Sequence, residues 1–435
     1  MKNVSTFQLV FLAVFVLIAI VGIAVFAGFG GSAKAPIPKA TIWGTVPSYY
    51  INEVVRNINI RSTVIEVSYV EKDPETFEDE FVNALAEGNG PDAVLLTDDM
   101  LYSQKNKLQP IPFTMYPERD YLNTFIDGAN LFVSKDGLLG IPLSVDPIVM
   151  YWNKNILAAS GISRAPLNWQ EMAQIGPTLI KKTDTSNIVQ ALVPFGEFTN
   201  VNNAKEILAT LFFQTGNTIT EQNKQTGEVY SVIDKDLDKT DESTAGIASV
   251  IDFYTSFANP SKSLYTWNRS LPNSLDAFIG GNLAFYFGYA SEISRIQDKN
   301  PNLNFDVAQV PQETGGTPQV YGKMTAFAIV KRSKNATGAL GVISKLTERA
   351  SVELWRDVAN LPPIRRDLLA EPAKDAYMTV FYRSAIQSRS WYDPNPRESN
   401  MVFRDMIESV TSGREKVSNA VGDAKLKLDR LLKTK

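Results

Sequence analysis

The fold is indicated most clearly by MYWNKNILAASGISRAPLNWQEM, residues Met150–Met172. Its first residues favour a β-strand, and Asn153 is placed to cap a helix that stops before Gly161. Asn168 can then cap a second helix, in which Glu171 at the third position can satisfy the backbone N–H of the cap residue in return. The segment therefore predicts a strand, a short helix and a capped second helix, in that order.

Upstream of this segment, apolar strands alternate with helices. Asp73 followed by Pro74 predicts a helix start, because Asp caps helices and Pro suits their first turn. Such alternation is typical of a parallel, doubly wound sheet with helices on both faces, so we predict the α/β class. The expected order is strand 40–43, helix 48–57, strand 64–70, helix 75–87, turn 88–91 and strand 92–96.

The composition excludes several classes of function. The 435 residues, 44% of them apolar, can support two domains with cores, and the net charge of −4 gives no drive to bind nucleic acid. The absence of Cys and His excludes disulfides, histidine bases and the commonest zinc and haem ligands, so we predict no cofactor and no metal. The alternating aspartates at 234–241 lack the glycine and final glutamate of a calcium loop, which indicates a solvated loop. Catalysis by carboxylates or lysine stays open.

The N-terminus predicts a membrane anchor. Phe7–Phe29 is almost continuously apolar and would span about 34 Å as a helix, enough for a hydrocarbon core of about 30 Å. A signal peptide has a shorter apolar region, and Pro36 makes a poor cleavage context after the A-x-A triplet at 33–35. We therefore expect 1–35 to be an uncleaved anchor and linker, with Lys2 inside and the rest extracytoplasmic. A cleaved signal peptide is the alternative.

Several segments, in order along the chain, resemble the bacterial family 1 extracellular solute-binding proteins of the maltose-binding type. The opening segment resembles the family's "YNK, helix, Gly, Pro, TW-E" pattern. The others are AEGNGPDAVLL (Ala86–Leu96), LLGIPLSVDPIVMYWNKN (Leu138–Asn155), FIGGNLAFYFGYASEI (Phe278–Ile293), VYGKMTAFAIVKRSKN (Val320–Asn335), LPPIRRD (Leu361–Asp367) and SGREKVSNAV (Ser412–Val421).

The resemblance implies two α/β lobes of the Venus flytrap type, joined by three crossing segments, with the ligand in the groove between them. It also implies a closed form that is recognised by the permease subunits of an ABC importer. On that template, the first lobe is 40–145 plus 288–322, the second is 148–284 plus 327–435, and the crossings lie near 145–148, 284–288 and 322–327.

Two groups in the first half are candidate ligand contacts. Trp43, Gly44 and Thr45 end the first predicted strand, where α/β clefts open, and a glycine there lets a ligand approach the backbone. Asp98 and Asp99 follow a later strand and match polar cleft positions of the family. The alternatives are a buried tryptophan with a simple turn for the first group and a solvated helix cap for the second.

Asp146 is the sharpest candidate, because the resemblance implies an acidic ligand contact in the first crossing and a buried carboxylate needs partners. A structural hinge carboxylate is the alternative. Tyr289 is a candidate platform for a sugar ring, with core packing as the alternative. Trp391 and Tyr392 are candidates to line the groove, with packing under a loop as the alternative, and Trp267 is a candidate contact from the second lobe. Many sugar-binding relatives have a tryptophan near the Tyr289 position, so its absence here weakens the expectation of a carbohydrate ligand.

The resemblance implies a membrane-anchored receptor that binds a small polar solute, a sugar or oligosaccharide, for an ABC importer. A polyol, glycerol phosphate or another nutrient is the first alternative ligand. An extracellular hydrolase using Asp98 and Asp99 is a different class, but adjacent strand residues point to opposite faces, so we predict no catalytic residues. An adhesin or sensor with the same fold also stays open.

Overall fold

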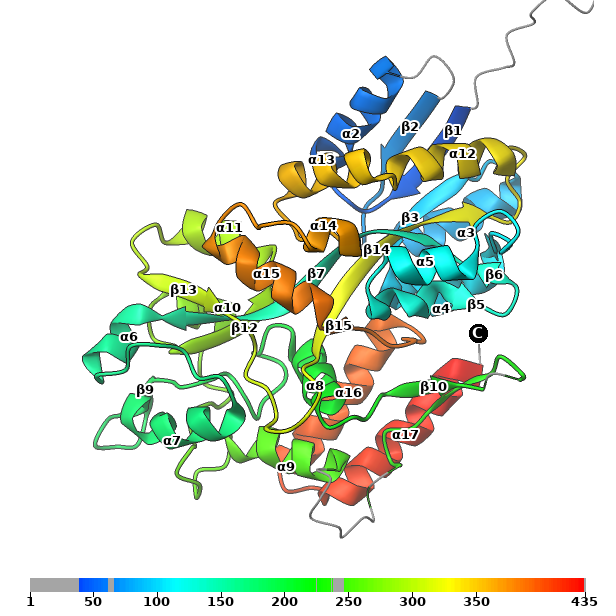
Figure 1. Cartoon of the computed structure of the whole chain (residues 1–435). Coiled ribbons are helices and arrows are strands. Elements are labelled where there is room, and N and C mark those ends of the chain that lie inside the picture. Colours follow the sequence, from blue (N-terminus) through cyan, green and yellow to red (C-terminus); the bar gives the residue numbers. More distant parts are fainter. Residues whose placement is uncertain (1–38, 62–65, 224, 236, 238–245, 434–435) are drawn as a thin grey trace, which may run out of the picture.

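The computed structural model describes residues 39–61, 66–223, 225–235, 237 and 246–433 and has a mixed α/β fold (Figure 1). The predicted anchor and linker at 1–35, and most of the aspartate-rich loop at 234–241, lie outside these residues. Within the described ranges, no helix is both long enough and apolar enough to cross a bilayer. The α/β class is confirmed, and the anchor stays a prediction.

The first elements follow the predicted order. They are β1 (Lys39–Gly44), α2 (Ser48–Arg61), β2 (Glu66–Glu71), α3 (Phe77–Glu87) and β3 (Ala93–Thr97). β1 pairs in parallel with both β2 and β3. α3 begins two residues later than predicted, because Asp73 first closes a turn in which its carboxylate accepts a hydrogen bond from the N–H of Glu75 at 2.8 Å.

Two long strands, β7 (Ile141–Asn153) and β14 (Val320–Val330), connect the two halves of the main sheet. Among the described residues this sheet has nine strands, in the order β12-β7-β14-β3-β1-β2, with β4, β13 and β15 paired alongside. The first half of β7 pairs antiparallel with β14, and its second half pairs antiparallel with β12 (Phe285–Tyr289) and β13 (Phe305–Ala308). The sheet is therefore mixed, and not parallel throughout as we expected.

The segment Met150–Met172 folds nearly as predicted. The Asn153 side chain caps α6 (Lys154–Ala159), and Gly161 follows with a φ of 73°. The Asn168 side chain accepts a hydrogen bond from the N–H of Glu171 at 2.8 Å and caps α7 (Trp169–Leu179). The Glu171 carboxylate reaches back one residue further than predicted, to the N–H before the cap residue, at 3.0 Å.

The helices that follow β14 lie on the opposite side from the one expected. We placed 327–435 in the second lobe, but α12 (Ala336–Leu346) and α13 (Arg349–Ala359) pack against β1 and α2 (Figure 1). We placed 288–322 in the first lobe, but β13 pairs with the far end of β7. The reason is connectivity, since β14 ends beside β3 and a short connection keeps the next helices on that side.

The C-terminal helices cover the other end of the molecule. α17 (Val417–Lys433) packs on α16 (Pro396–Thr411) and α9 (Ile247–Ser256), as its apolar spacing predicts, and α8 (Ala204–Gln214) packs on β14. The remaining elements are α4 (Asp98–Gln104), η1 (Lys105–Lys107), β4 (Leu108–Gln109), α5 (Glu118–Thr124), η2 (Asp127–Phe132), β5 (Val133–Ser134), β6 (Gly137–Leu138), β8 (Lys181–Lys182), β9 (Ile188–Gln190), β10 (Thr220–Gln222), β11 (Val229–Ser231), α10 (Ser274–Ile279), α11 (Glu292–Lys299), α14 (Arg366–Leu369), α15 (Ala376–Ile386) and β15 (Ser388–Arg389).

Candidate functional site

Asp98 is a buried carboxylate at the point where β3 passes directly into α4. Its Oδ1 accepts a hydrogen bond from the backbone N–H of Met324 at 2.8 Å, and its Oδ2 accepts from the Tyr321 hydroxyl at 3.3 Å and from the Ser390 hydroxyl. Burial, followed by the charge of Asp99, raises the pKa of Asp98 to about 7 against these hydrogen bonds, which lower it. The alternative of a solvated cap is therefore wrong for Asp98.

Asp99 is only partly buried and faces a different partner. Its Oδ1 accepts a hydrogen bond from the hydroxyl of Thr97, which lies opposite Thr325 in the β3–β14 ladder. The Thr325 hydroxyl is in turn 2.7 Å from that of Ser144 on β7. The two adjacent carboxylates therefore have separate hydrogen-bond partners.

Asp146 and Lys323 are opposite each other in the antiparallel β7–β14 ladder. Within β7, Asp146 is the one residue that is not fully buried, and its Oδ1 accepts a hydrogen bond from the N–H of Ser291 at 3.0 Å. Burial raises the pKa of Asp146 to about 6, although the bonds from Ser291 and the charge of Lys323 oppose the shift. Asp146 thus links the crossing strand to the turn between β12 and α11.

The ammonium group of Lys323 lies in a strongly acidic environment. Burial lowers the pKa of Lys323, but the charges of Asp99, Glu206, Asp98 and Asp146 outweigh that effect and raise it. These carboxylates come from α4, α8 and β7, which are far apart in sequence. The crossing strands therefore bring together charged groups from both halves of the sheet.

Tyr289, at the end of β12, is next to this lysine. The Lys323 Nζ is 4.8 Å from the centre of the Tyr289 ring, and the ring meets that of Tyr321 edge to face with centroids 6.5 Å apart. The hydroxyl of Tyr289 is buried and has no hydrogen-bond partner in the part of the chain that the structure describes. A buried hydroxyl without a partner is costly, so this group is a strong candidate for a ligand contact.

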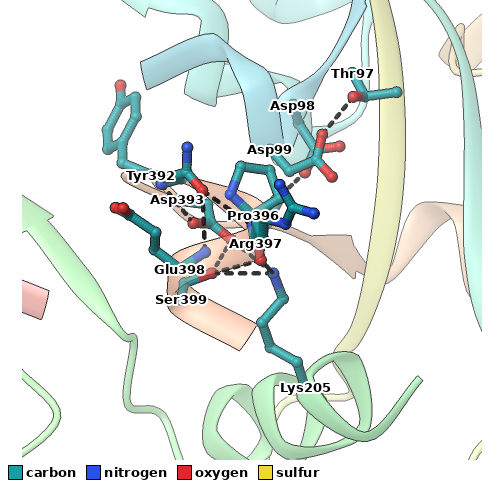
Figure 2. Close-up of polar contacts among 12 residues, drawn as sticks. Thr97, Asp98, Asp99, Lys205, Tyr392, Asp393, Pro396, Arg397, Glu398 and Ser399 are labelled. Atoms are coloured by element: carbon teal, nitrogen blue, oxygen red, sulfur yellow. Dashed lines mark hydrogen bonds and ion pairs between the residues drawn. The ribbon is translucent and has the colours of Figure 1, made fainter. Parts of the chain in front are cut away.

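A buried ion pair joins α8 to the segment that precedes α16. Figure 2 shows Lys205 pointing from α8 toward Asp393 and Ser399, on the segment that leads into α16. Its Nζ is 2.8 Å from the Asp393 Oδ2 and 3.1 Å from the Ser399 Oγ, and the Ser399 hydroxyl also donates to Asp393 at 2.8 Å. The pair therefore holds the segment that contains Trp391 and Tyr392 against α8.

A cavity of about 180 Å³ lies beside the crossing strands. Asp146 and Lys323 are in its wall, together with hydroxyl groups of the same two strands. The remaining wall comes from the loop after β1, the start of α11 and the end of α13. The lining residues are Val46, Pro47, Tyr50, Ser144, Asp146, Ser291, Ile293, Ser294, Lys323, Thr325, Trp355, Ala359, Asn360 and Leu361.

The predicted group at the end of β1 directly precedes Val46 and Pro47, which line this cavity, but is not itself in the lining. Trp43 is partly buried, with the Lys72 Nζ 3.9 Å from its ring centre. A Cβ on Gly44 would lie 2.9 Å from the backbone oxygen of Leu95, so this glycine permits close packing of the strands. Thr45 is partly buried and precedes the residues that line the cavity. Their contact with a ligand stays a prediction.

The two other candidate tryptophans, Trp267 and Trp391, are packed inside the protein. Trp267 has no exposed surface, and its Nε1 donates to the Asn200 side chain at 3.1 Å. Trp391 is 3% exposed and packs against Phe403 with ring centroids 6.1 Å apart. Tyr392 is partly buried, and its hydroxyl donates to the carbonyl of Leu131 at 3.0 Å. For both tryptophans, the structure therefore agrees with the alternative of core packing.

With this geometry described, comparison with known proteins identifies the family. A sequence model described as "Bacterial extracellular solute-binding protein" matches residues 56–380, three quarters of the chain. The chain belongs to this family. The resemblance read from the ordered segments is thereby confirmed, and the binding domain of the solute-binding protein is assigned to the extracytoplasmic side. The comparison with curated proteins gave no match.

Solved structures support the same fold. A cyclo/maltodextrin-binding protein complexed with maltotetraose has a TM-score of 0.73 and 16% identity over 93% of this chain and 98% of that one. The sugar-binding protein MalE from Xanthomonas citri has a TM-score of 0.72 and 17% identity over 91% and 98%. CpMnBP1 with mannobiose bound has a TM-score of 0.65 and 18% identity over 90% and 99%. These likenesses show the fold, and it is the family model, described as one of solute-binding proteins, that supports a non-enzymatic reading.

Sequence reasoning missed Lys205, Glu206, Lys323 and Asp393. The first two lie in the first turn of an ordinary helix, and Asp393 lies in a turn-rich loop. Lys323 could have been found, because it is the one charge within the predicted crossing strand VYGKMTAFAIV. A charge inside a buried strand needs a partner on the neighbouring strand, and Asp146 is that partner in the ladder.

Proposed function

We propose that the solute-binding protein encloses a small polar solute at the junction of β7 and β14. The proposed contacts are Asp99, Asp146, Tyr289 and Lys323, with Glu206 on the α8 side. Trp43, Gly44 and Thr45 adjoin the same space and are proposed as its outer rim. Asp98 has three partners within the protein, so we assign it to positioning α4 and not to direct contact.

One observation supports this proposal above the others. The Tyr289 hydroxyl is buried without a partner among the described residues, and the Nζ of Lys323, 4.8 Å from the centre of the same ring, forms no ion pair with a described carboxylate. Such groups are expensive to leave unsatisfied inside a protein. A solute with several hydroxyl groups would satisfy both, because each hydroxyl can donate and accept.

The solute class that we propose is a sugar or oligosaccharide. The sugars named for the similar structures support this choice, although those proteins are under 20% identical to this chain. The site chemistry supports it as well, since carboxylates, an ammonium group and tyrosine rings are the groups that bind hydroxyls and sugar faces.

The transport role is part of the same proposal. We propose that the two groups of elements on either side of β7 and β14 move as lobes, and that closure about the crossing strands presents the solute to the permease subunits of an ABC importer. We further propose that Phe7–Phe29 anchors the protein in the membrane. Proteinase treatment of whole cells, followed by detection of an N-terminal fragment in the membrane, tests the anchor.

The binding proposal is tested with the full-length chain purified in detergent. Melting temperatures are recorded with a panel of neutral mono- and oligosaccharides, and isothermal titration gives Kd for each one that stabilises the protein. A ligand at 100 times its Kd stabilises the folded state by about 2.7 kcal/mol. Mass spectrometry of the ligand after incubation checks that it is returned unchanged, as expected for a receptor.

The matched variants are Asp146→Asn and Asp306→Asn. Both aspartates lie on strands that pair with β7 or belong to it, but Asp306 is on the outer strand β13, where its one ion pair among the described residues is with Lys154, at 3.9 Å. We expect Asp146→Asn to weaken sugar binding at least tenfold and Asp306→Asn to leave it unchanged. Equal affinity in the two variants would remove Asp146 from the site.

A further inference from the structure

The turn at 289–291, between β12 and α11, is bound through its backbone to side chains and to β7. The N–H of Tyr289 donates to the Glu292 Oε1 at 2.9 Å, and its carbonyl accepts from the Tyr151 hydroxyl at 2.7 Å. The next two N–H groups, those of Ala290 and Ser291, donate to residues of β7 at 2.9 and 3.0 Å. These bonds fix the backbone from which the Tyr289 ring extends.

Glu292, the first residue of α11, binds three partners with one carboxylate. Besides the N–H of Tyr289, its Oε1 accepts from the Asn203 side chain at 2.8 Å, and its Oε2 accepts from the Tyr286 hydroxyl at 2.5 Å. Gly288 leaves the room that this requires, because a Cβ there would lie 2.5 Å from the Tyr286 ring and 3.0 Å from the Glu292 Oε1. One carboxylate therefore joins the end of β12 to the residue that precedes α8.

Asn203 departs from the usual role of an asparagine at the start of a helix. Asn is among the residues preferred for capping a helix, yet within the described part of the chain its side chain makes no capping bond to α8. Its φ of 57° is left-handed, whereas a cap residue normally has an extended backbone, and its amide donates to Glu292 instead. Departures from such local preferences concentrate at functional sites.

Resting on the proposed function, we propose that Glu292, held by Asn203, is the residue that positions Tyr289 for the solute. Glu292 holds the Tyr289 backbone at its N–H while Tyr151 holds it at its carbonyl, so the buried hydroxyl is in place before the solute arrives. Pre-organisation of this kind strengthens binding, because less freedom is lost on association. Glu292 acts as a hydrogen-bond acceptor and does not touch the solute.

The binding experiment measures Kd by isothermal titration on the full-length chain, with glucose, galactose, mannose, maltose and cellobiose. Glu292→Met keeps the length of the side chain and removes both oxygens, and we expect it to weaken binding at least tenfold. Glu292→Gln should stay within twofold of the wild type, because its amide oxygen can accept from Tyr289 and its NH₂ can donate to the Tyr286 hydroxyl.

The control is Glu118→Met, since Glu118 is likewise the first residue of its helix, α5, and is exposed. It should leave Kd unchanged. Equal Kd values for Glu292→Met and Glu118→Met would overturn the proposal, as would an equal loss in Glu292→Gln and Glu292→Met.

A double-mutant cycle with Tyr289→Phe separates positioning from general damage. Tyr289→Phe removes only the hydroxyl, so Glu292→Met is expected to weaken binding less than twofold in that background. A full tenfold loss there would mean that Glu292 acts elsewhere, and the proposal would be wrong. If Glu292→Met does not fold, Asn203→Gly takes its place, because glycine suits the left-handed backbone and only the amide is lost. A three- to fivefold loss is then expected, and an unchanged Kd would overturn the proposal.

Hydrogen exchange of the ligand-free protein separates this inference from the proposed function. Mass spectrometry of peptides that cover 286–293 follows the N–H groups of the turn. We expect exchange there to be at least tenfold faster in Glu292→Met than in the wild type, and unchanged in Glu292→Gln and Glu118→Met. If no sugar binds, the sugar proposal is wrong, while faster exchange still shows that Glu292 fixes the turn. Unchanged exchange in Glu292→Met would overturn this inference even where a sugar binds.

Discussion

The buried pair of Lys205 and Asp393 gives the most quantitative prediction. The side chains are 7% and 2% exposed, and the Nζ to Oδ2 distance is 2.8 Å. Removing one partner of such a pair leaves a buried charge and typically costs about 3 to 5 kcal/mol. Lys205→Met and Asp393→Asn are therefore both expected to reduce the free energy of unfolding, but by different amounts.

The size of each effect follows from the hydrogen bonds that remain. In Lys205→Met, the Asp393 carboxylate keeps the Ser399 hydroxyl at 2.8 Å and the N–H of Asn395 at 3.0 Å, so we expect about 3 kcal/mol. In Asp393→Asn, the ammonium group keeps Ser399 and the carbonyl of Pro396 but loses its one ion-pair partner among the described residues, so we expect about 4 to 5 kcal/mol. Replacing both by Met and Leu leaves no buried charge and should cost less than either single change.

The pH dependence provides an internal check. Burial raises the pKa of Asp393 and the charge of Lys205 lowers it, so removing the lysine raises this pKa further. Asp393 then takes up a proton more readily in the folded state than in the unfolded state. Since a folded-state pKa above the unfolded one makes stability fall with rising pH, Lys205→Met should be less destabilising at pH 5 than at pH 8.

The assay is urea unfolding followed by tryptophan fluorescence, at pH 5 and pH 8, on the wild type, the two single variants and the double variant. A coupling free energy of about 2 kcal/mol or more is expected from the double-mutant cycle. Single effects below about 1 kcal/mol that simply add in the double variant would refute the reasoning, because they would mean that the pair is well solvated.

Three further predictions concern single sites. The folded-state pKa of Asp98 is raised to about 7, so stability should fall by up to about 4 kcal/mol as the pH rises from about 4 to 7, and Asp98→Asn should flatten that decline in urea titrations. Gly44→Ala should destabilise the folded protein by about 1 to 3 kcal/mol, because its Cβ would lie 2.9 Å from the oxygen of Leu95. The Cβ of Gly341→Ala, on α12, would meet nothing within 4 Å, so this control should stabilise the folded protein by about 0.5 to 1 kcal/mol in the same titrations. Trp267→Ala should cost about 3 to 5 kcal/mol and yet leave the Kd of any bound sugar unchanged, since its ring is in the core; a loss of binding without a loss of stability would return it to the site.

The sequence predicts the early elements and the opening segment well because those features are local. The Asn153 cap, the turn at Gly161 and the parallel strands β1, β2 and β3 depend on residues close together in the chain. The side on which α12 packs depends instead on where β14 leaves the sheet, beside β3. Pairing between strands that are so far apart in sequence cannot be read from hydrophobic periodicity, which is why the lobe ranges differ from those expected.

For the same reason, only some residues of the candidate site can be predicted from the sequence. Asp146 stands out in the sequence because it interrupts an apolar run, and the structure places it at the junction. Trp267 is a candidate contact and Trp391 a candidate to line the groove, but large aromatic rings are also the best core residues, and their chemistry alone does not separate the two roles. Nothing in the sequence marks Glu206 as a site residue, since an acidic residue in the first turn of a helix is common and needs no functional explanation.

The double pairing of β7 explains why the charged groups meet where they do. Its first half is bonded to β14 and its second half to β12, so the position near Asp146 is where one set of partners replaces the other. Polar side chains at that position border the cavity that the two crossing strands share with the start of α11 and the end of α13. A carboxylate placed there is therefore close to elements of both halves of the sheet: Asp146 lies opposite Lys323 of β14 and accepts a hydrogen bond from the N–H of Ser291, after β12.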